Sequence, residues 1–114
     1  MFENRQPGAG TRVLLDYMLG EKKIPPSGLP GYDRISITHL EAANKVASGV
    51  ADATLGIKAA ADALGLHFIP VADEPYELVF SEGFDDHPAA KFLLGAIESA
   101  EWREAVRGMG GYKF

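Results

Sequence analysis

Residues 4–12, with the sequence NRQPGAGTR, combine backbone and side chains that suit the binding of an anion. Their glycines allow bare backbone to approach a ligand closely. Thr11 is predicted to be the N-cap of a helix, because an apolar run at helical spacing starts directly behind it. A helix start carries a partial positive charge, and Arg5 and Arg12 offer planar forks of donors for oxyanions. This stretch therefore predicts an anion cradle at a helix N-terminus.

The alternative for the same stretch is a plain structural turn, because many glycine-rich turns before helices bind nothing. It is not a Walker loop, since no Lys-Ser/Thr pair follows the last glycine. It also lacks the complete dinucleotide spacing, because Gly8-Ala9-Gly10 has no glycine three places further on. For the side chains, pairing of Arg5 with a carboxylate and solvation of Arg12 remain open.

The composition favours one soluble globular domain. The chain has 114 residues, of which 46% are hydrophobic and 24% charged. Its net charge of −5 argues against direct nucleic-acid binding. No apolar run approaches the roughly 18–20 residues that span a bilayer. The absence of cysteine excludes disulfides and thiolate metal ligands, and it fits a cytoplasmic location.

Strand-like and helix-like segments alternate through the first two thirds of the chain. Strands are expected at 1–5 (as an edge strand), 33–37, 52–57, 68–71 and 76–80, and helices at 12–19, 38–48 and 58–64. This alternation predicts an α/β fold with a largely parallel sheet flanked by helices. We expect a single domain over 1–114, with an α/β core at 1–80 and a C-terminal helical segment at 84–114 that breaks near Ser99.

The middle helix has the clearest local signature. Thr38 and Glu41 fit a capping box, in which Glu41 reaches back to the N-cap backbone N–H. Its buried stripe is expected to consist of apolar side chains at helical spacing, namely Leu40, Ala43, Val46 and Ala47.

Three predicted helix starts follow strands, and ligands of open α/β sheets bind where helices begin, beyond the carboxyl ends of the strands. These starts lie at Thr11, at Thr38-His39 and at the turn 56–58. We expect them to converge at one sheet edge with Arg5 or Arg12. The alternative for His39 is an exposed residue in a first helical turn.

No constellation for catalysis or metal binding is recognisable. No serine or threonine lies in a nucleophile elbow, and no His/Asp/Glu spacing is typical of a metal site. The carboxylates Asp73, Glu74 and Glu77 are typical of a solvated turn. The prediction is a protein that is not an enzyme and has no catalytic residues, metal or cofactor.

Several segments, in order, carry a family resemblance. They are NRQPGAGTRVLLD at 4–16, GYD at 31–33, TH at 38–39, VASGVADATLGIKAAA at 46–61 and LGLHFIPVADEPYELV at 64–79. They resemble the periplasmic-binding-protein-like domain of molybdate-related proteins. That domain occurs attached to molybdopterin-biosynthesis (MoeA-type) domains or to helix-turn-helix modules.

The resemblance implies one lobe of a type II solute-binding fold, with an oxyanion of the molybdate or tungstate type held between two lobes. The ligand-binding residues it implies, together with the residue reasoning above, are Arg5, Gly8, Ala9, Gly10, Thr11, Arg12, Thr38, His39, Thr54 and Gly56. Two positions depart from the family pattern, since Ala9 stands where serine is usual and Pro75 where arginine is usual. Because the resemblance starts just before the loop, we expect only the second lobe here.

The expected function is therefore binding or sensing of a small oxyanion, linked to molybdenum cofactor metabolism or its regulation. The alternative is a ligand-free interaction or oligomerisation module derived from the same fold. In that case the apolar surface around 68–80 or around the Trp102 helix drives self-association. A homo-oligomer, or a partner that supplies the second lobe, fits either reading.

Overall fold

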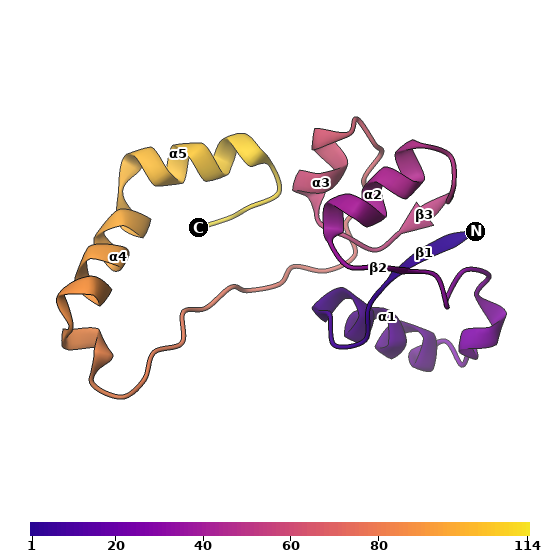
Figure 1. Ribbon diagram of the computed structural model, residues 1–114, viewed down its shortest axis with the longest axis horizontal. Helices are drawn as coiled ribbons and strands as arrows, with labels where there is room; N and C mark the ends of the chain where they lie inside the picture. The colour runs from indigo at the N-terminus through magenta and orange to yellow at the C-terminus, as the bar shows by residue number, and fades with distance from the viewer. The chain divides into compact units, whose positions relative to one another are not determined.

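The computed structural model describes residues 1–114, which divide into unit 1, Met1–Phe68, and unit 2, Ile69–Phe114. Unit 1 contains the strands β1 (Phe2–Arg5), β2 (Ile35–Ser36) and β3 (Ala53–Thr54), all parallel and ordered β2-β1-β3 (Figure 1). The predicted α/β class with a parallel sheet and flanking helices is confirmed. The prediction of an edge strand at residues 1–5 is wrong, because β1 pairs on both sides and is the central strand.

Helix α1 (Gly10–Glu21) begins earlier than the sequence indicated. Pro7 and Gly8 form a tight turn closed by the Ala9 N–H, which donates to Gln6 O at 3.2 Å. Gly8 has a φ of 91°, as the third residue of a type II turn requires. This turn delivers the chain in helical geometry at Gly10, so Ala9 is the N-cap residue. The prediction of Thr11 as N-cap is wrong.

The capping box of α2 (His39–Ala47) is confirmed with one shift. Thr38 Oγ1 accepts from the Glu41 N–H at 3.0 Å, and Glu41 Oε2 accepts from the Ile37 N–H, one residue before the expected donor. The predicted stripe is wrong for Leu40 and Ala47, which are exposed. The helix instead buries Ala42 and Ala43, because small side chains let it lie close to the sheet.

The core of unit 1 combines small apolar side chains with a buried polar strand. The 3₁₀ turn η1 (Pro26–Gly28) precedes β2, and helix α3 (Lys58–Ala63) follows β3. Glu3, Asn4 and Arg5 of β1 are all buried. The apolar residues buried around them are Leu15, Ala42, Ala43, Ala51, Ala60 and Ala61.

Glu3 is the acidic centre of this core. Its carboxylate accepts from Arg34 Nε at 2.9 Å and from Ser36 Oγ at 2.7 Å. Burial raises the pKa of Glu3, but the hydrogen bonds from Ser36 and Arg34 and the charges of Arg34 and Lys45 outweigh it and lower the pKa below its ordinary 4.5. The charged form of Glu3 is therefore part of the folded state.

Unit 2 contains the 3₁₀ turn η2 (Phe84–Asp86) and the helices α4 (Pro88–Glu98) and α5 (Ala100–Met109). The predicted break is confirmed at Ser99, whose Oγ accepts from the Trp102 N–H and caps α5. The strands predicted at 68–71 and 76–80 are absent, because no neighbouring strand pairs with this stretch and prolines remove two of its donors. No helix in either unit has the length and apolar character needed to cross a bilayer.

Gly31 offers a direct test of how closely the loop before β2 packs on β1. Its φ is 99°, and a Cβ built there would lie 1.9 Å from Phe2 O. Gly31→Ala is therefore expected to lower the free energy of unfolding by more than about 2 kcal/mol, through strain and the loss of the Phe2 N–H to Pro30 O hydrogen bond. Gly20→Ala in α1, where nothing lies within 4 Å, is the matched control and is expected to stabilise by about 0.5–1 kcal/mol. Urea unfolding of both variants measures the difference, and equal stabilities would contradict this packing.

Glu3 also sets a pH dependence. Because its pKa is lower in the folded than in the unfolded chain, its stabilisation is present above about pH 4.5 and is lost as the pH falls through the folded pKa. Glu3→Gln is expected to lower the stability at pH 7 by roughly 1–3 kcal/mol and to flatten the acid slope. Asp52→Asn is the control, because Asp52 has its pKa lowered by the N-terminal ammonium group but is fully exposed. Urea titrations from pH 7 to pH 3 test this, and an unchanged slope in Glu3→Gln would refute it.

Candidate functional site

The turn before α1 presents unpaired backbone donors. The first intrahelical bond runs from the Val13 N–H to Ala9 O, at 3.0 Å. The N–H groups of Gly10, Thr11 and Arg12 precede it and have no acceptor in the chain, as the first turn of a helix requires. Gly8 is exposed beside them. This end of α1 has the positive partial charge and the free amides of an anion-binding helix start.

Arg5 connects this turn to the start of α2. It ends β1 with its side chain buried, and Nη2 donates to Ile37 O at 2.8 Å. Nη1 lies 2.8 Å from His39 Nδ1, and Nε donates to Gln6 Oε1. A guanidinium has five N–H groups and no acceptor, so these contacts use three of them. Arg5 does not pair with a carboxylate; it ties two of the predicted helix starts together.

The contact with Arg5 also determines the tautomer of His39. Since a guanidinium only donates, Nδ1 of His39 is the acceptor, and the ring proton lies on Nε2. A Cβ built at Gly56 would lie 3.7 Å from the same Nδ1, so the chain entering α3 passes close to His39. Arg5, His39 and Gly56 are thus brought together at the carboxyl edge of the sheet, as the sequence predicted.

Arg12 is held by α1 and by the loop before β2. Its Nη1 donates to Arg5 O at 2.9 Å, and its guanidinium lies 4.4 Å from the centre of the Tyr32 ring. Nε lies 3.7 Å from Asp16 Oδ2, an ion pair without a hydrogen bond. Tyr32 in turn donates its hydroxyl to Asp16 at 2.7 Å. Arg12 therefore stabilises the turn between β1 and α1 through its contacts with Arg5 O and the Tyr32 ring. Its side chain is mostly buried, so it is not a solvated arginine.

Two other predicted site hydroxyls are occupied by structural bonds. Thr54 Oγ1 donates to Glu3 O at 2.8 Å and so joins β3 to β1. Thr38 Oγ1 accepts the cap bond of α2, although its own proton is not used there. Thr11 differs from both, because its Oγ1 is buried and has no hydrogen-bond partner. A buried hydroxyl without a partner destabilises the fold, so Thr11 is the unusual member of the set.

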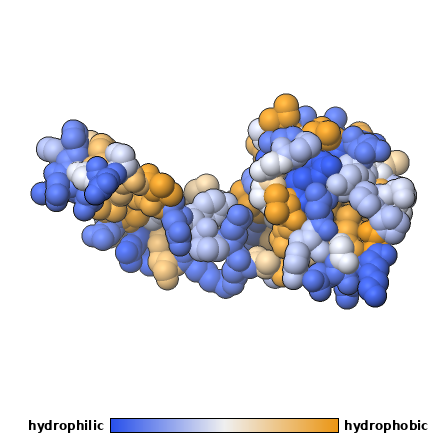
Figure 2. Space-filling view, turned by 90° about the horizontal axis from the view of Figure 1, so that it is seen from below, coloured by the Kyte–Doolittle hydropathy of each residue, from blue (hydrophilic) through white to orange (hydrophobic).

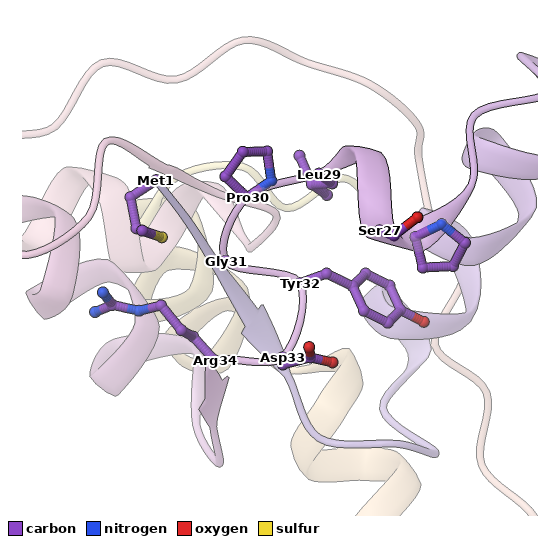
Figure 3. A pocket seen from close by; sticks show the side chains of 9 residues that line it. Met1, Ser27, Leu29, Pro30, Gly31, Tyr32, Asp33 and Arg34 are labelled. Atoms are coloured by element: carbon purple, nitrogen blue, oxygen red, sulfur yellow. The ribbon is translucent and has the colours of Figure 1, made fainter.

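A separate hollow of about 570 Å³ lies at the opposite edge of the sheet. It is lined by Met1, which precedes β1, and by residues 26–27 and 29–34, which precede β2. Figure 3 shows Tyr32 and Arg34 pointing to opposite sides of this loop. Because the strands are parallel, this is the amino edge. The hollow contains none of the predicted site residues, and the helix starts that offer free amides lie at the other edge.

The sequence analysis did not identify Asn4 and Tyr32, which contact Arg5 and Arg12 and hold them in place. Asn4 accepts from the Arg5 N–H through Oδ1 and donates through Nδ2 to Tyr32 O. Tyr32 supports Arg12 from twenty positions away in the chain. The available signal was the run of three polar residues inside a predicted strand, since buried polar side chains must find partners.

The chain is similar to one family model and to two uncharacterized bacterial proteins. Residues 1–98 match a family model described as a PBP superfamily domain. The "Uncharacterized protein YvgK" of Bacillus subtilis is 34% identical over 110 residues, which is 96% of this chain and 35% of that protein. The "Uncharacterized protein in ferredoxin 2Fe-2S gene 5'region" of Clostridium pasteurianum is 35% identical over 101 residues, 88% of this chain and 89% of that protein. This chain thus spans about a third of the Bacillus relative, and no solved structure matches.

The unpaired hydroxyl of Thr11 generates a stability prediction. Thr11→Val keeps the shape of the side chain and removes a buried polar group that has no partner. The variant is expected to be as stable as the parent or more stable, by up to about 1–3 kcal/mol, in buffer without added anions. Thr54→Val is the control and is expected to destabilise, because it removes the bond to Glu3 O. Urea unfolding compares the two, and a large loss of stability in Thr11→Val would show that the hydroxyl is needed by the fold itself.

Proposed function

Because this chain belongs to the PBP superfamily, the periplasmic-binding-protein-like domains, we propose that unit 1 binds a small tetrahedral oxyanion of the molybdate or tungstate type. The proposed site is the carboxyl edge of the sheet, at the start of α1. Recognition involves no chemical step, so the protein acts as a binding or sensing domain and not as an enzyme.

The observation that carries the proposal is the combination of free donors at the start of α1. The amides of Gly10, Thr11 and Arg12 have no acceptor, and the Thr11 hydroxyl beside them is buried without one. An oxyanion at this position accepts from these groups and gains from the helix dipole. Gly8 leaves the approach open, because a Cβ there would meet nothing within 4 Å.

Arg5 and His39 supply the second part of the proposed site. The buried guanidinium of Arg5 places a positive charge at the base of the edge, and two of its five N–H groups remain for a further acceptor. Arg12 acts differently, because its contacts with Arg5 O and Tyr32 hold the turn in the shape that presents the amides. In this proposal Arg5 attracts the anion and Arg12 positions the loop.

The resemblance to molybdate-related domains supports a role in molybdenum cofactor metabolism or its regulation, within the cytoplasm. In that role a second lobe closes over the anion, and occupancy is transmitted to a fused or partner domain. The Bacillus relative extends over nearly three times the matched length, so its chain has room for such domains. One lobe alone supplies only part of the donors, and its affinity is expected to be correspondingly lower.

Thermal unfolding with molybdate, tungstate, sulfate or phosphate at matched ionic strength tests the proposal. An anion at about 100 times its dissociation constant stabilises the fold by roughly 2.7 kcal/mol, or several degrees. Molybdate and tungstate are expected to raise the melting temperature more than sulfate and phosphate do. Equal shifts for all four anions would reduce the site to a generic helix-terminus site, and the absence of any shift at millimolar anion would contradict binding by this lobe.

Two variants locate the site. Thr11→Val is expected to weaken molybdate binding by about tenfold or more, because it removes one hydrogen bond to a charged acceptor. Ser27→Ala, in the hollow at the amino edge, is the matched control and is expected to leave the affinity unchanged. The reverse pattern in isothermal titration calorimetry would move the site to the hollow.

A further inference from the structure

Helix α4 exposes an apolar surface that nothing in unit 2 covers. The exposed fractions are 80% for Phe92, 40% for Leu93 and 37% for Leu94. Between Lys91 and Glu98 the helix contains no charged residue, and only Ala90 is fully buried in unit 2. Figure 2 shows hydrophobic side chains gathered on the helical part of this unit, at the left. A helix that is apolar around most of its circumference is normally buried.

The two charged residues of α4 are placed against the preference of a lone helix. Lys91 lies near the N-terminus and Glu98 at the C-terminus, whereas the helix dipole favours the opposite order. Neither side chain has an ion-pair partner within unit 2. They are seven residues apart, so they lie on the same flank of the helix. In an antiparallel pair of α4 helices, this flank brings each lysine opposite the glutamate of the other copy.

Gly95 lies midway between these two charges. Glycine destabilises a helix interior relative to alanine, and here a Cβ would meet nothing within 4 Å. The fold of unit 2 therefore gives no reason for glycine at this position. A second helix crossing closely at Gly95 does give one, because it needs a position without a side chain.

We propose that α4 is a self-association surface, on which α4 of a second copy packs antiparallel about a two-fold axis near Gly95. Phe92 and its symmetry mate flank the crossing, and two Lys91–Glu98 pairs form between the copies. A two-fold arrangement is self-complementary and closed, so it yields a dimer and not a filament. This inference concerns unit 2 and does not depend on anion binding by unit 1.

Sedimentation equilibrium of the full chain tests the surface by charge exchange. The parent is expected to form a dimer of twice the 12.2 kDa chain mass at micromolar concentration. Lys91→Glu and Glu98→Lys are each expected to raise the dimer dissociation constant at least about fivefold, because two attractions become two repulsions. The double variant with both changes restores the attraction and is expected to return to within about twofold of the parent.

The controls separate association from folding. Glu101→Lys makes the same charge change on α5 and is expected to leave the dimer intact. Gly95→Leu is expected to weaken the dimer while its circular dichroism stays helical, since the first added carbon meets nothing within unit 2. The proposal would be overturned if the parent chain stayed monomeric at about 100 times that micromolar concentration. It would also be overturned by a dimer that is insensitive to these changes, or by single variants that the double variant does not rescue.

Discussion

Unit 1 depends on the burial of a polar strand at its centre. Glu3, Asn4 and Arg5 of β1 are buried, and the apolar residues around them are mostly alanines with little surface to bury. The carboxylate of Glu3 can be charged there because Arg34 neutralises its charge and because both Arg34 and Ser36 donate hydrogen bonds to it. The roughly 1–3 kcal/mol expected for loss of the Glu3 charge is a large part of the stability of so small a domain. The polar contacts of β1 therefore fix the sheet order more firmly than its small apolar core can.

The same strand sets the geometry of the carboxyl edge. Arg5 contacts Ile37 and His39, and its own carbonyl accepts from Arg12. Arg5 thus contacts both elements: its guanidinium binds the start of α2, and its backbone carbonyl accepts from Arg12 at the start of α1. A site built on these elements inherits its rigidity from β1, so stability and ligand geometry are coupled through Arg5. The Thr11 hydroxyl at this edge is buried and has no hydrogen-bond partner.

Short-range rules predicted the features that depend only on neighbouring residues. The capping box at Thr38, the helix break at Ser99 and the alternation that gives a parallel sheet are of this kind. The errors concern contacts between distant segments. The sequence could not show that β1 pairs on both sides, that Glu3 meets Arg34, or that 68–80 would find no strand partner. The N-cap error at Thr11 came from the turn, whose closing bond starts the helix at Gly10. The predicted site residues around Arg5 and His39 do converge, whereas their ligand remains a proposal.

The charge distribution limits how an anion can be recognised by this chain. Unit 1 contains seven basic and seven acidic side chains, so the net charge of −5 resides in unit 2. A neutral unit provides no long-range attraction for a dianion, and salt screens distant charges beyond about 8–10 Å. In the proposed site, binding therefore depends on donors within hydrogen-bond distance, at the start of α1 and at Arg5. Tetrahedral dianions of equal charge differ mainly in size, so discrimination among them depends on the spacing of these donors. That spacing is set by the turn at Gly8 and by the contacts of Arg5 and Arg12, so in the proposed site the strand that stabilises the sheet also determines the positions of the donors.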